Sequence, residues 1–138
     1  MVCKLTRTRG PFLSILLWGN LLVGVSQAKG VTKAIRFINY LGNLFPQTGI
    51  KLDQYSSLID KLIKRCPFLL IAGKQACLIR GLLLYFFGKR NGLNIKLCFG
   101  SKQTNRGFDT HCWIVCNGRI LYEVDKVIEQ YTTLVEYA

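Results

Sequence analysis

The chain has 138 residues and half of them are apolar, which suits one domain with a modest core. This composition excludes fibrous and disordered proteins. Nineteen Lys and Arg against seven Asp and Glu give a formal net charge of +12. That charge is compatible with nucleic acid, an anionic membrane face or an acidic peptide as a partner, and the basic residues are too scattered to choose among them.

The first segment has two interpretations. Basic residues precede an apolar run over residues 11–25, and Ser26-Gln27-Ala28 resembles a small-residue cleavage site, which is the layout of a secretory signal. The apolar periodicity continues beyond this point, however, through residues 31–44. We therefore expect two helices, over 11–25 and 31–44, separated near Lys29-Gly30 and packed onto a core.

A third helix is predicted after the turn at residues 45–49. Ser57 followed by Asp60 is a capping-box pattern, so we expect this helix to open at Ser57 and to stop before Pro67. Its predicted inward side chains are Leu58, Ile59, Leu62 and Ile63.

Residues 74–87 form the most informative segment. Their pattern is helical but apolar on nearly every face, which is typical of a helix that runs through the middle of a domain. Basic residues and glycines at 88–92 mark its end. Cys77 falls in its first turn.

Three strands are predicted next, over residues 93–99, 108–116 and 119–125, with a polar loop between the first two. Asn117-Gly118 is a strong hairpin signal. The predicted fold class is therefore α+β: a buried helix carrying a cysteine packs on a small antiparallel sheet. We expect a single domain over 1–138, with a helical half (1–66) and a mixed half (67–138).

Most of the six cysteines lie in apolar runs, so buried reduced thiols are expected for most of them. His111, Cys112 and Cys116 offer three soft ligands for zinc. Strand alternation, however, would point both cysteines away from the histidine. We therefore expect neither a metal nor a cofactor.

Cys77 and His111 are candidates for a nucleophile and its base. The start of a helix stabilises a thiolate, and a nearby imidazolium stabilises it further. His111 is the only histidine in the chain. A catalytic imidazole also needs an acceptor that fixes its orientation, and Glu123 and Asp125 are the carboxylates across the predicted hairpin.

The alternation of side chains along the strands decides whether these carboxylates lie on the same sheet face as His111. If Asn117-Gly118 is a two-residue loop, His111 faces away from both of them. If the loop comprises residues 116–118 with a bulge, His111 faces Glu123 directly and Asp125 diagonally. The sequence leaves both loop types open, but only the bulged loop gives a triad. For that reason we predict the bulged loop, with a positive φ at Gly118.

The second half of the chain resembles the lasso-peptide leader peptidases, small members of the transglutaminase-like superfamily. Their cysteine motif is C-L-P-R-S-L-A-L, their histidine motif is H-A-W-V, and an aspartate follows twelve residues after the histidine. This sequence has Cys77-Leu-Ile-Arg-Gly-Leu-Leu-Leu, then Gly92 leading into the run 93–100, then His111-Cys-Trp-Ile-Val. The apolar first helix and the overall length also match.

The chain departs from this pattern at several positions. Ile79 replaces the proline of the motif and Gly81 its serine, whereas Arg80 is kept. Cys112 stands where alanine is usual, and Glu123 where aspartate is usual.

The resemblance implies a papain/transglutaminase-like catalytic core over residues 67–138. Cys77, His111 and Glu123 would be its catalytic residues, with Asp125 as an alternate third member. It also implies a cytoplasmic enzyme that removes the leader from a ribosomally made precursor peptide. The implied partners are a separate leader-binding protein and a lasso cyclase, with no nucleic acid.

Two other functions remain open. The same triad can transfer an acyl group to an amine, as in true transglutaminases. A basic chain with an apolar start can instead be a non-enzymatic membrane-surface or nucleic-acid binder. Because the aromatic residues fall mostly in apolar runs, we rank binding last and do not expect a membrane partner.

Overall fold

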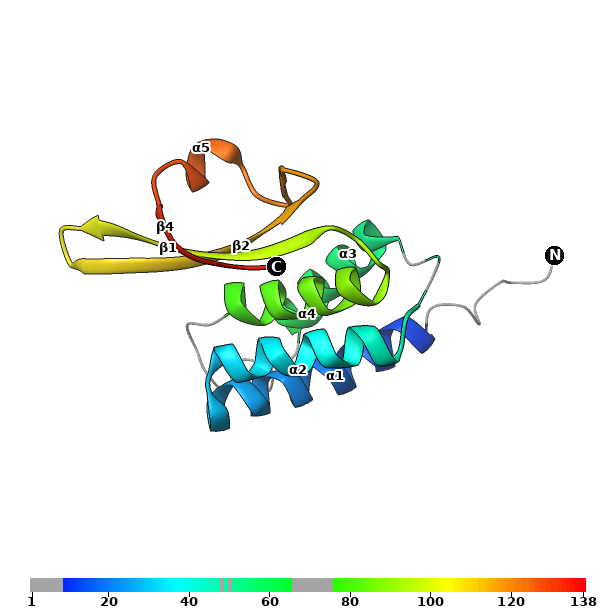
Figure 1. Ribbon diagram of the computed structural model, residues 1–138. Helices are drawn as coiled ribbons and strands as arrows, with labels where there is room; N and C mark the ends of the chain where they lie inside the picture. The colour runs from blue at the N-terminus through cyan, green and yellow to red at the C-terminus, as the bar shows by residue number, and fades with distance from the viewer. Residues whose placement is uncertain (1–8, 48, 50, 66–75) are drawn as a thin grey trace.

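The fold is built around one helix, α4 (Ala76–Arg90), in a computed structural model that describes residues 9–47, 49, 51–65 and 76–138. Helices α1 (Arg9–Lys29) and α2 (Val31–Leu44) cover one side of α4, and α3 (Leu52–Arg65) packs beside it (Figure 1). A four-stranded antiparallel sheet covers the other side. The predicted α+β class is confirmed.

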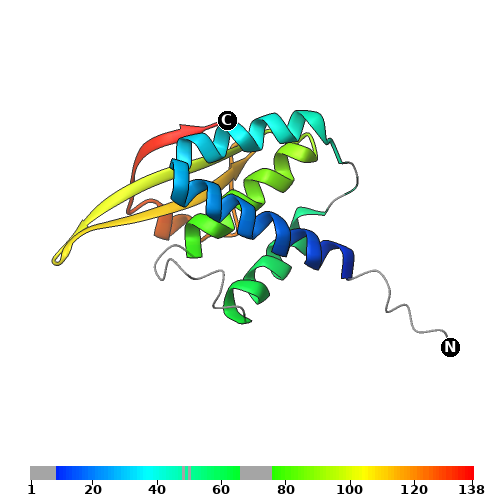
Figure 2. The ribbon, with the colours of Figure 1, turned by 90° about the horizontal axis from the view of Figure 1, so that it is seen from below.

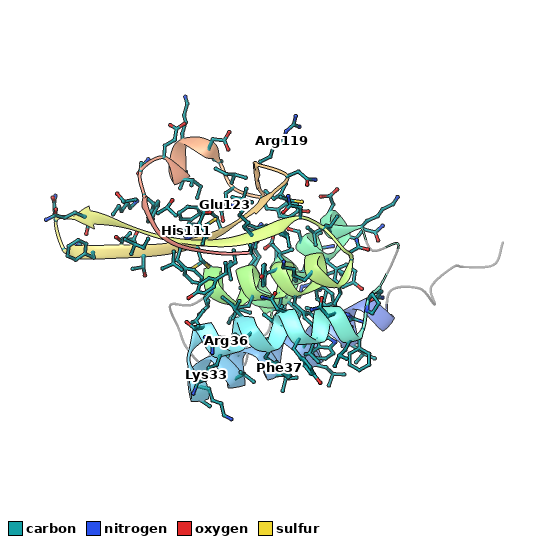
Figure 3. All side chains as sticks on the ribbon, in the orientation of Figure 1. Lys33, Arg36, Phe37, His111, Arg119 and Glu123 are labelled. Atoms are coloured by element: carbon teal, nitrogen blue, oxygen red, sulfur yellow. The ribbon has the colours of Figure 1, made fainter. Side chains whose placement is uncertain are left out.

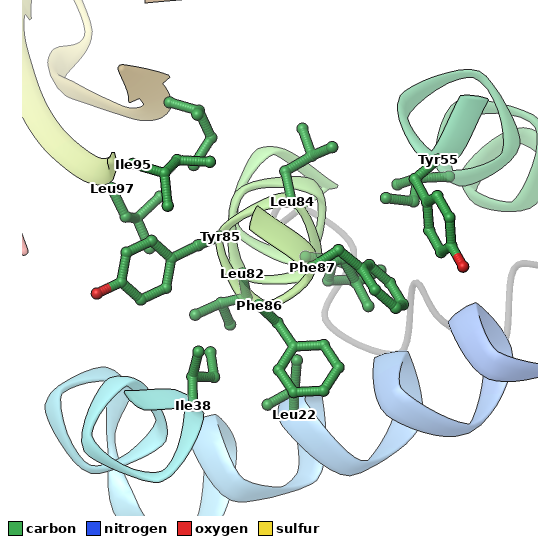
Figure 4. Close-up of a cluster of buried hydrophobic side chains, with 14 of the residues drawn as sticks. Leu22, Ile38, Tyr55, Leu82, Leu84, Tyr85, Phe86, Phe87, Ile95 and Leu97 are labelled. Carbon is green, nitrogen blue, oxygen red and sulfur yellow. The ribbon is translucent and has the colours of Figure 1, made fainter. Parts of the chain in front are cut away.

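Helix α4 is central because almost all of its side chains are apolar. Ile79 and residues 81–88 are buried. Figure 4 shows how its side chains divide between neighbours: Phe86 points toward α1 and Phe87 toward α3. The Phe87 ring lies 4.3 Å from that of Tyr55. Burial of each large apolar side chain contributes about 1.5–3 kcal/mol, so both covering layers are needed.

The two N-terminal helices agree with the prediction. The break falls at Gly30, whose φ of 86° is readily adopted only by glycine. Helix α2 has the predicted bounds, whereas α1 continues to Lys29. None of the helices in the described ranges combines the length and the hydropathy needed to cross a bilayer.

Helix α3 begins earlier than predicted. It starts at Leu52 rather than at Ser57, so the capping-box interpretation is wrong. Its buried residues recur at intervals of three and four, which continues the inward face back to the helix start. They are Leu52, Tyr55, Ser56, Ile59 and Leu62. The predicted stop before Pro67 lies outside the described residues.

The sheet has the order β3-β2-β1-β4. Strands β1 (Ile95–Thr104) and β2 (Gly107–Cys116) form a long hairpin that closes at Thr104 and Gly107. The predicted polar loop between them is therefore wrong. Its residues are in strands whose side chains near the tip meet solvent, so they show no apolar alternation.

The C-terminal part differs most from the prediction. Strand β3 (Arg119–Leu121) has only three residues, and a short helix, α5 (Asp125–Ile128), follows where the predicted strand ended. Strand β4 (Thr132–Tyr137), which was not predicted, pairs with β1. Ile128 of α5 packs with Trp113 on the sheet face opposite to α4.

Candidate active site

Cys77 lies in the first turn of α4, where the helix faces the sheet. Its side chain is partly buried and packs against the main core. The unpaired amides at a helix start favour a negative charge there. The start of the predicted helix, at residues 74 and 75, lies outside the described residues.

The surroundings of Cys77 lower its pKa from 9.0 to about 5. The largest cause is a hydrogen bond donated by the Cys112 thiol. The backbone amide of Cys112 and the side chain of His111 also donate hydrogen bonds, and the charge of His111 adds to them. Together they outweigh burial, which raises the pKa. These surroundings therefore favour the thiolate form of Cys77.

Cys112, in contrast to Cys77, is a protonated thiol. Its donation to the Cys77 thiolate, followed by burial, raises the pKa of the Cys112 thiol strongly, so Cys112 keeps its proton. The four cysteines within the described ranges are Cys77, Cys98, Cys112 and Cys116, and all are free.

Cys112 packs against Gly81, and these are two of the positions at which the sequence differs from the leader-peptidase motifs. A Cβ atom added at Gly81 would lie 3.2 Å from the Cys112 sulfur and 2.9 Å from Leu97 Cδ1. The sulfur thus fills space beside a position that has no side chain. In the pattern, serine and alanine occupy the two positions. Here the larger side chain has moved to the other partner, so the pair forms one packing unit.

His111 lies on β2, on the same strand face as Trp113, and its side chain is still near enough to Cys77 to help lower the pKa of that thiol. Its ring contacts Tyr131, with centroids 5.5 Å apart, and is roughly parallel to the Trp113 ring. Cys112, next along the strand, points into the core toward α4. The predicted alternation is therefore present. Within the described part of the chain, no three His, Cys, Asp or Glu side chains are placed to hold a metal ion.

The loop between β2 and β3 has two residues, so the predicted three-residue bulge is wrong. Cys116 pairs directly with Arg119. Asn117 and Gly118 have φ values of 51° and 77°, as expected of a turn whose twist matches that of the strands. The predicted positive φ at Gly118 is correct, but it belongs to a different turn.

Glu123 nevertheless reaches His111, as Figure 3 shows for the two labelled side chains. Strand β3 stops at Leu121, and the next residue, Tyr122, has a φ of 61°. Because the strand ends before Glu123, the alternation of side chains along β3 does not turn Glu123 away from His111. Glu123 Oε1 lies 3.4 Å from His111 Nε2.

That distance is longer than a formed hydrogen bond, which is normally 2.7–3.2 Å long. His111 Nε2 is buried and makes no hydrogen bond to the described part of the chain. Asp125, the alternate candidate, begins α5 and lines a separate hollow of about 690 Å³ with Arg119 and Tyr131. The structure thus brings Glu123 to His111, and not Asp125.

Arg80 belongs to the same cluster, a role that the sequence analysis did not assign. Its Nη1 atom lies 3.2 Å from Glu123 Oε1, and its Nε atom lies 2.9 Å from Asp60 Oδ1 on α3. Both of its terminal nitrogens donate to the carbonyl of Tyr122 at 3.3 Å. Arg80 therefore fixes the segment that carries Glu123. Its spacing of three residues from Cys77 on the same helix was the available signal.

The space enclosed by this cluster is small. A cavity of about 10 Å³ lies between α4 and the β2–β3 hairpin, and Cys77, Cys112 and Glu123 line it. That volume is close to the minimum for one water molecule. Cys77 and Glu123 both line this cavity, and the imidazole of His111 lies against Glu123 at its edge. A cysteine, an imidazole and a carboxylate are the groups that covalent catalysis by a cysteine requires.

A family model described as "Transglutaminase-like superfamily" matches residues 46–136 of the chain. The match includes α3, α4, the strands β1 to β3 and all but the last residue of β4, and therefore Cys77, His111 and Glu123. No curated protein and no solved structure matches the chain.

Proposed function

This chain belongs to the transglutaminase-like superfamily, whose members are typically cysteine-dependent enzymes, and on that basis we propose that it is a cysteine peptidase that removes the leader from a lasso-peptide precursor. The observation that supports this most is the cluster formed by Cys77, in the first turn of α4, with Glu123 and with His111, whose Nε2 atom lies 3.4 Å from Glu123 Oε1. Glu123, the third residue of the cluster, stands twelve positions beyond His111, where the leader peptidases have aspartate.

In this proposal the reaction begins at the bond between leader and core. The Cys77 thiolate attacks the carbonyl carbon, and the carbonyl oxygen becomes an oxyanion. The backbone amide of Cys77 is the first donor to that oxyanion. The carbon–nitrogen bond then breaks, and the His111 imidazolium gives its proton to the departing amine. The leader remains attached to Cys77 as a thioester.

Water completes the cycle. Neutral His111 takes a proton from the water as it attacks the thioester, and the carbon–sulfur bond breaks to release the leader carboxylate. The Cys77 thiolate and the His111 imidazolium are restored. Glu123 orients the imidazole and stabilises its charged form, and Arg80 holds Glu123 in place.

The proposed partners follow from the same resemblance. A separate leader-binding protein presents the precursor to this chain in the cytoplasm. The freed amine of the core then passes to an ATP-dependent lasso cyclase. No cofactor takes part in the cleavage.

The experiment combines the purified chain with a lasso-type precursor, with and without its leader-binding protein, and follows the products by mass spectrometry. We expect one cut at the leader–core junction, fast only when the leader-binding protein is present and absent in Cys77→Ala. Full-speed cleavage by the chain alone would contradict the need for that partner.

A second arm adds a primary amine to the same mixture. Incorporation of the amine into the precursor without a cut would identify an acyltransferase, and the peptidase proposal would then be wrong. Lack of either reaction, with a folded chain and a competent precursor complex, would exclude both.

A further inference from the structure

The acidic residues are absent from one part of the chain. The first 52 residues contain seven Lys and Arg and no Asp or Glu, so all seven acidic residues lie beyond them. This part includes α1 and α2, the two helices that cover α4 on the side away from the sheet. Figure 2 views the molecule from that side. The outer surface of this layer therefore carries positive charge that no acid of its own helices offsets.

The same surface exposes large apolar side chains. On α1 the exposed leucines recur every four residues, and on α2 the exposed residues recur every three or four, so each set lies on one helix face. The α1–α2 face consists of Leu13, Leu17, Leu21, Lys33, Arg36 and Tyr40. Leu17 is 70% exposed and Tyr40 is 61% exposed. Leu44 and Phe45, at the end of α2, are exposed as well.

The face lies away from the candidate active site. Figure 3 shows Lys33 and Arg36 on α2 at one side of α4, with His111 and Glu123 on the other side, at the sheet. Burial of the α1–α2 face would thus leave the cysteine site open to solvent. Whatever binds the face does not compete with substrate.

We propose that the α1–α2 face binds the surface of an anionic lipid bilayer. Exposed leucines and a tyrosine suit the boundary between headgroups and acyl chains, where the tyrosine hydroxyl can stay in contact with water. Lys33, Arg36 and Lys29 are exposed on the same layer and pair with lipid phosphates. The helices lie in the plane of the membrane, and the site above them acts on substrate at its surface.

Other occupants fit these residues less well. A second copy of the chain would place the same basic residues on both sides of a symmetric interface, with no acid from α1 or α2 to pair with them. The sequence placed most aromatic residues in apolar runs, which counted against membrane binding. Two of them, Tyr40 and Phe45, are nevertheless exposed on α2 and at its end.

The experiment is flotation of the full chain with two kinds of vesicle, one of phosphatidylcholine alone and one of phosphatidylcholine with phosphatidylglycerol in equal parts. We expect binding only to the anionic vesicles, and weaker binding as salt rises. Leu17→Glu and Lys33→Glu should each weaken binding at least about tenfold. The matched controls, Leu134→Glu on β4 and Lys126→Glu on α5, change residues that are also exposed but lie elsewhere, and both should bind like wild type.

Equal binding to both vesicles, or equal losses in the test and control variants, would overturn the proposal. So would a wild-type dimer that Leu17→Glu converts to a monomer, because the face would then join two copies. If Leu17→Glu instead blocks precursor cleavage without vesicles present, the face docks a protein partner and not a membrane. Vesicle binding does not depend on cleavage, so it tests the face separately from the peptidase proposal.

Discussion

The Cys112 thiol, rather than His111, makes the largest contribution to the low pKa of Cys77, and replacing Cys112 tests this directly. With a pKa of about 5, roughly nine-tenths of Cys77 is thiolate at pH 6, whereas a thiol at 9.0 is about one-thousandth ionised there. In Cys112→Ala the thiolate loses its strongest donor. We expect the pKa of Cys77 to rise by about one unit or more, because the backbone amide and His111 remain.

The assay is the rate of iodoacetamide alkylation of Cys77 as a function of pH, read by mass spectrometry on the peptide that contains it. Since only the thiolate reacts, the rate falls as pH drops through the pKa of Cys77. The fall should occur near pH 5 in wild type and at higher pH in Cys112→Ala. Cys98→Ala removes another buried thiol and should leave the midpoint unchanged.

An unchanged midpoint in Cys112→Ala, together with a large upward shift in His111→Ala, would refute this account and leave an ordinary cysteine–histidine pair.

The stability of the fold gives a second measurement on the same variant. Cys112→Ala leaves a gap beside Gly81 and should destabilise the fold by about 1 kcal/mol or more. Adding Gly81→Ser should recover part of that loss, whereas Gly81→Ser alone overpacks the site. If the changes in the free energy of unfolding of the two single variants simply add in the double variant, Cys112 and Gly81 do not pack as one unit.

Three further predictions concern catalysis. Cys77→Ala should abolish leader cleavage without loss of the fold, and residual cleavage within about tenfold of wild type would exclude Cys77 as the nucleophile. His111→Ala should be about as damaging, and the double variant no worse, because the two residues act as one unit; losses that multiply would show separate roles. Glu123→Gln should slow cleavage much more than Asp125→Asn does, with kcat measured at saturating precursor. Equal effects would mean that Glu123 does not orient His111.

The sequence was sufficient to predict the elements that form the core. The all-round apolar pattern at 74–87 identified the buried helix, and its first turn located Cys77. The alternation in β2 correctly turned His111 away from Cys112. Burial gives these segments a strong periodic signal, and for that reason their type was predictable.

Segments that do not bury one face against the core lack this periodic signal, so their structure could not be predicted in the same way. The outer half of the β1–β2 hairpin is mostly exposed and has no apolar alternation, so it resembled a loop. The position of Glu123 depended on the positive φ at Tyr122. A tyrosine gives no sequence signal for that conformation, which glycine or asparagine would have given. The contacts of Arg80 with Asp60 and Glu123 join three separate elements and have no local pattern at all.

The central position of α4 has a practical consequence for shorter versions of this protein. The family match begins at residue 46, which invites expression of residues 46–136 alone. Such a fragment would lack α1 and α2. It would uncover Phe86, which packs on Trp18, and would break the hydrogen bond that Tyr85 donates to Asn39. We expect this fragment to precipitate on expression, and a monodisperse, cooperatively melting fragment would show that α1 and α2 are accessory to the catalytic fold.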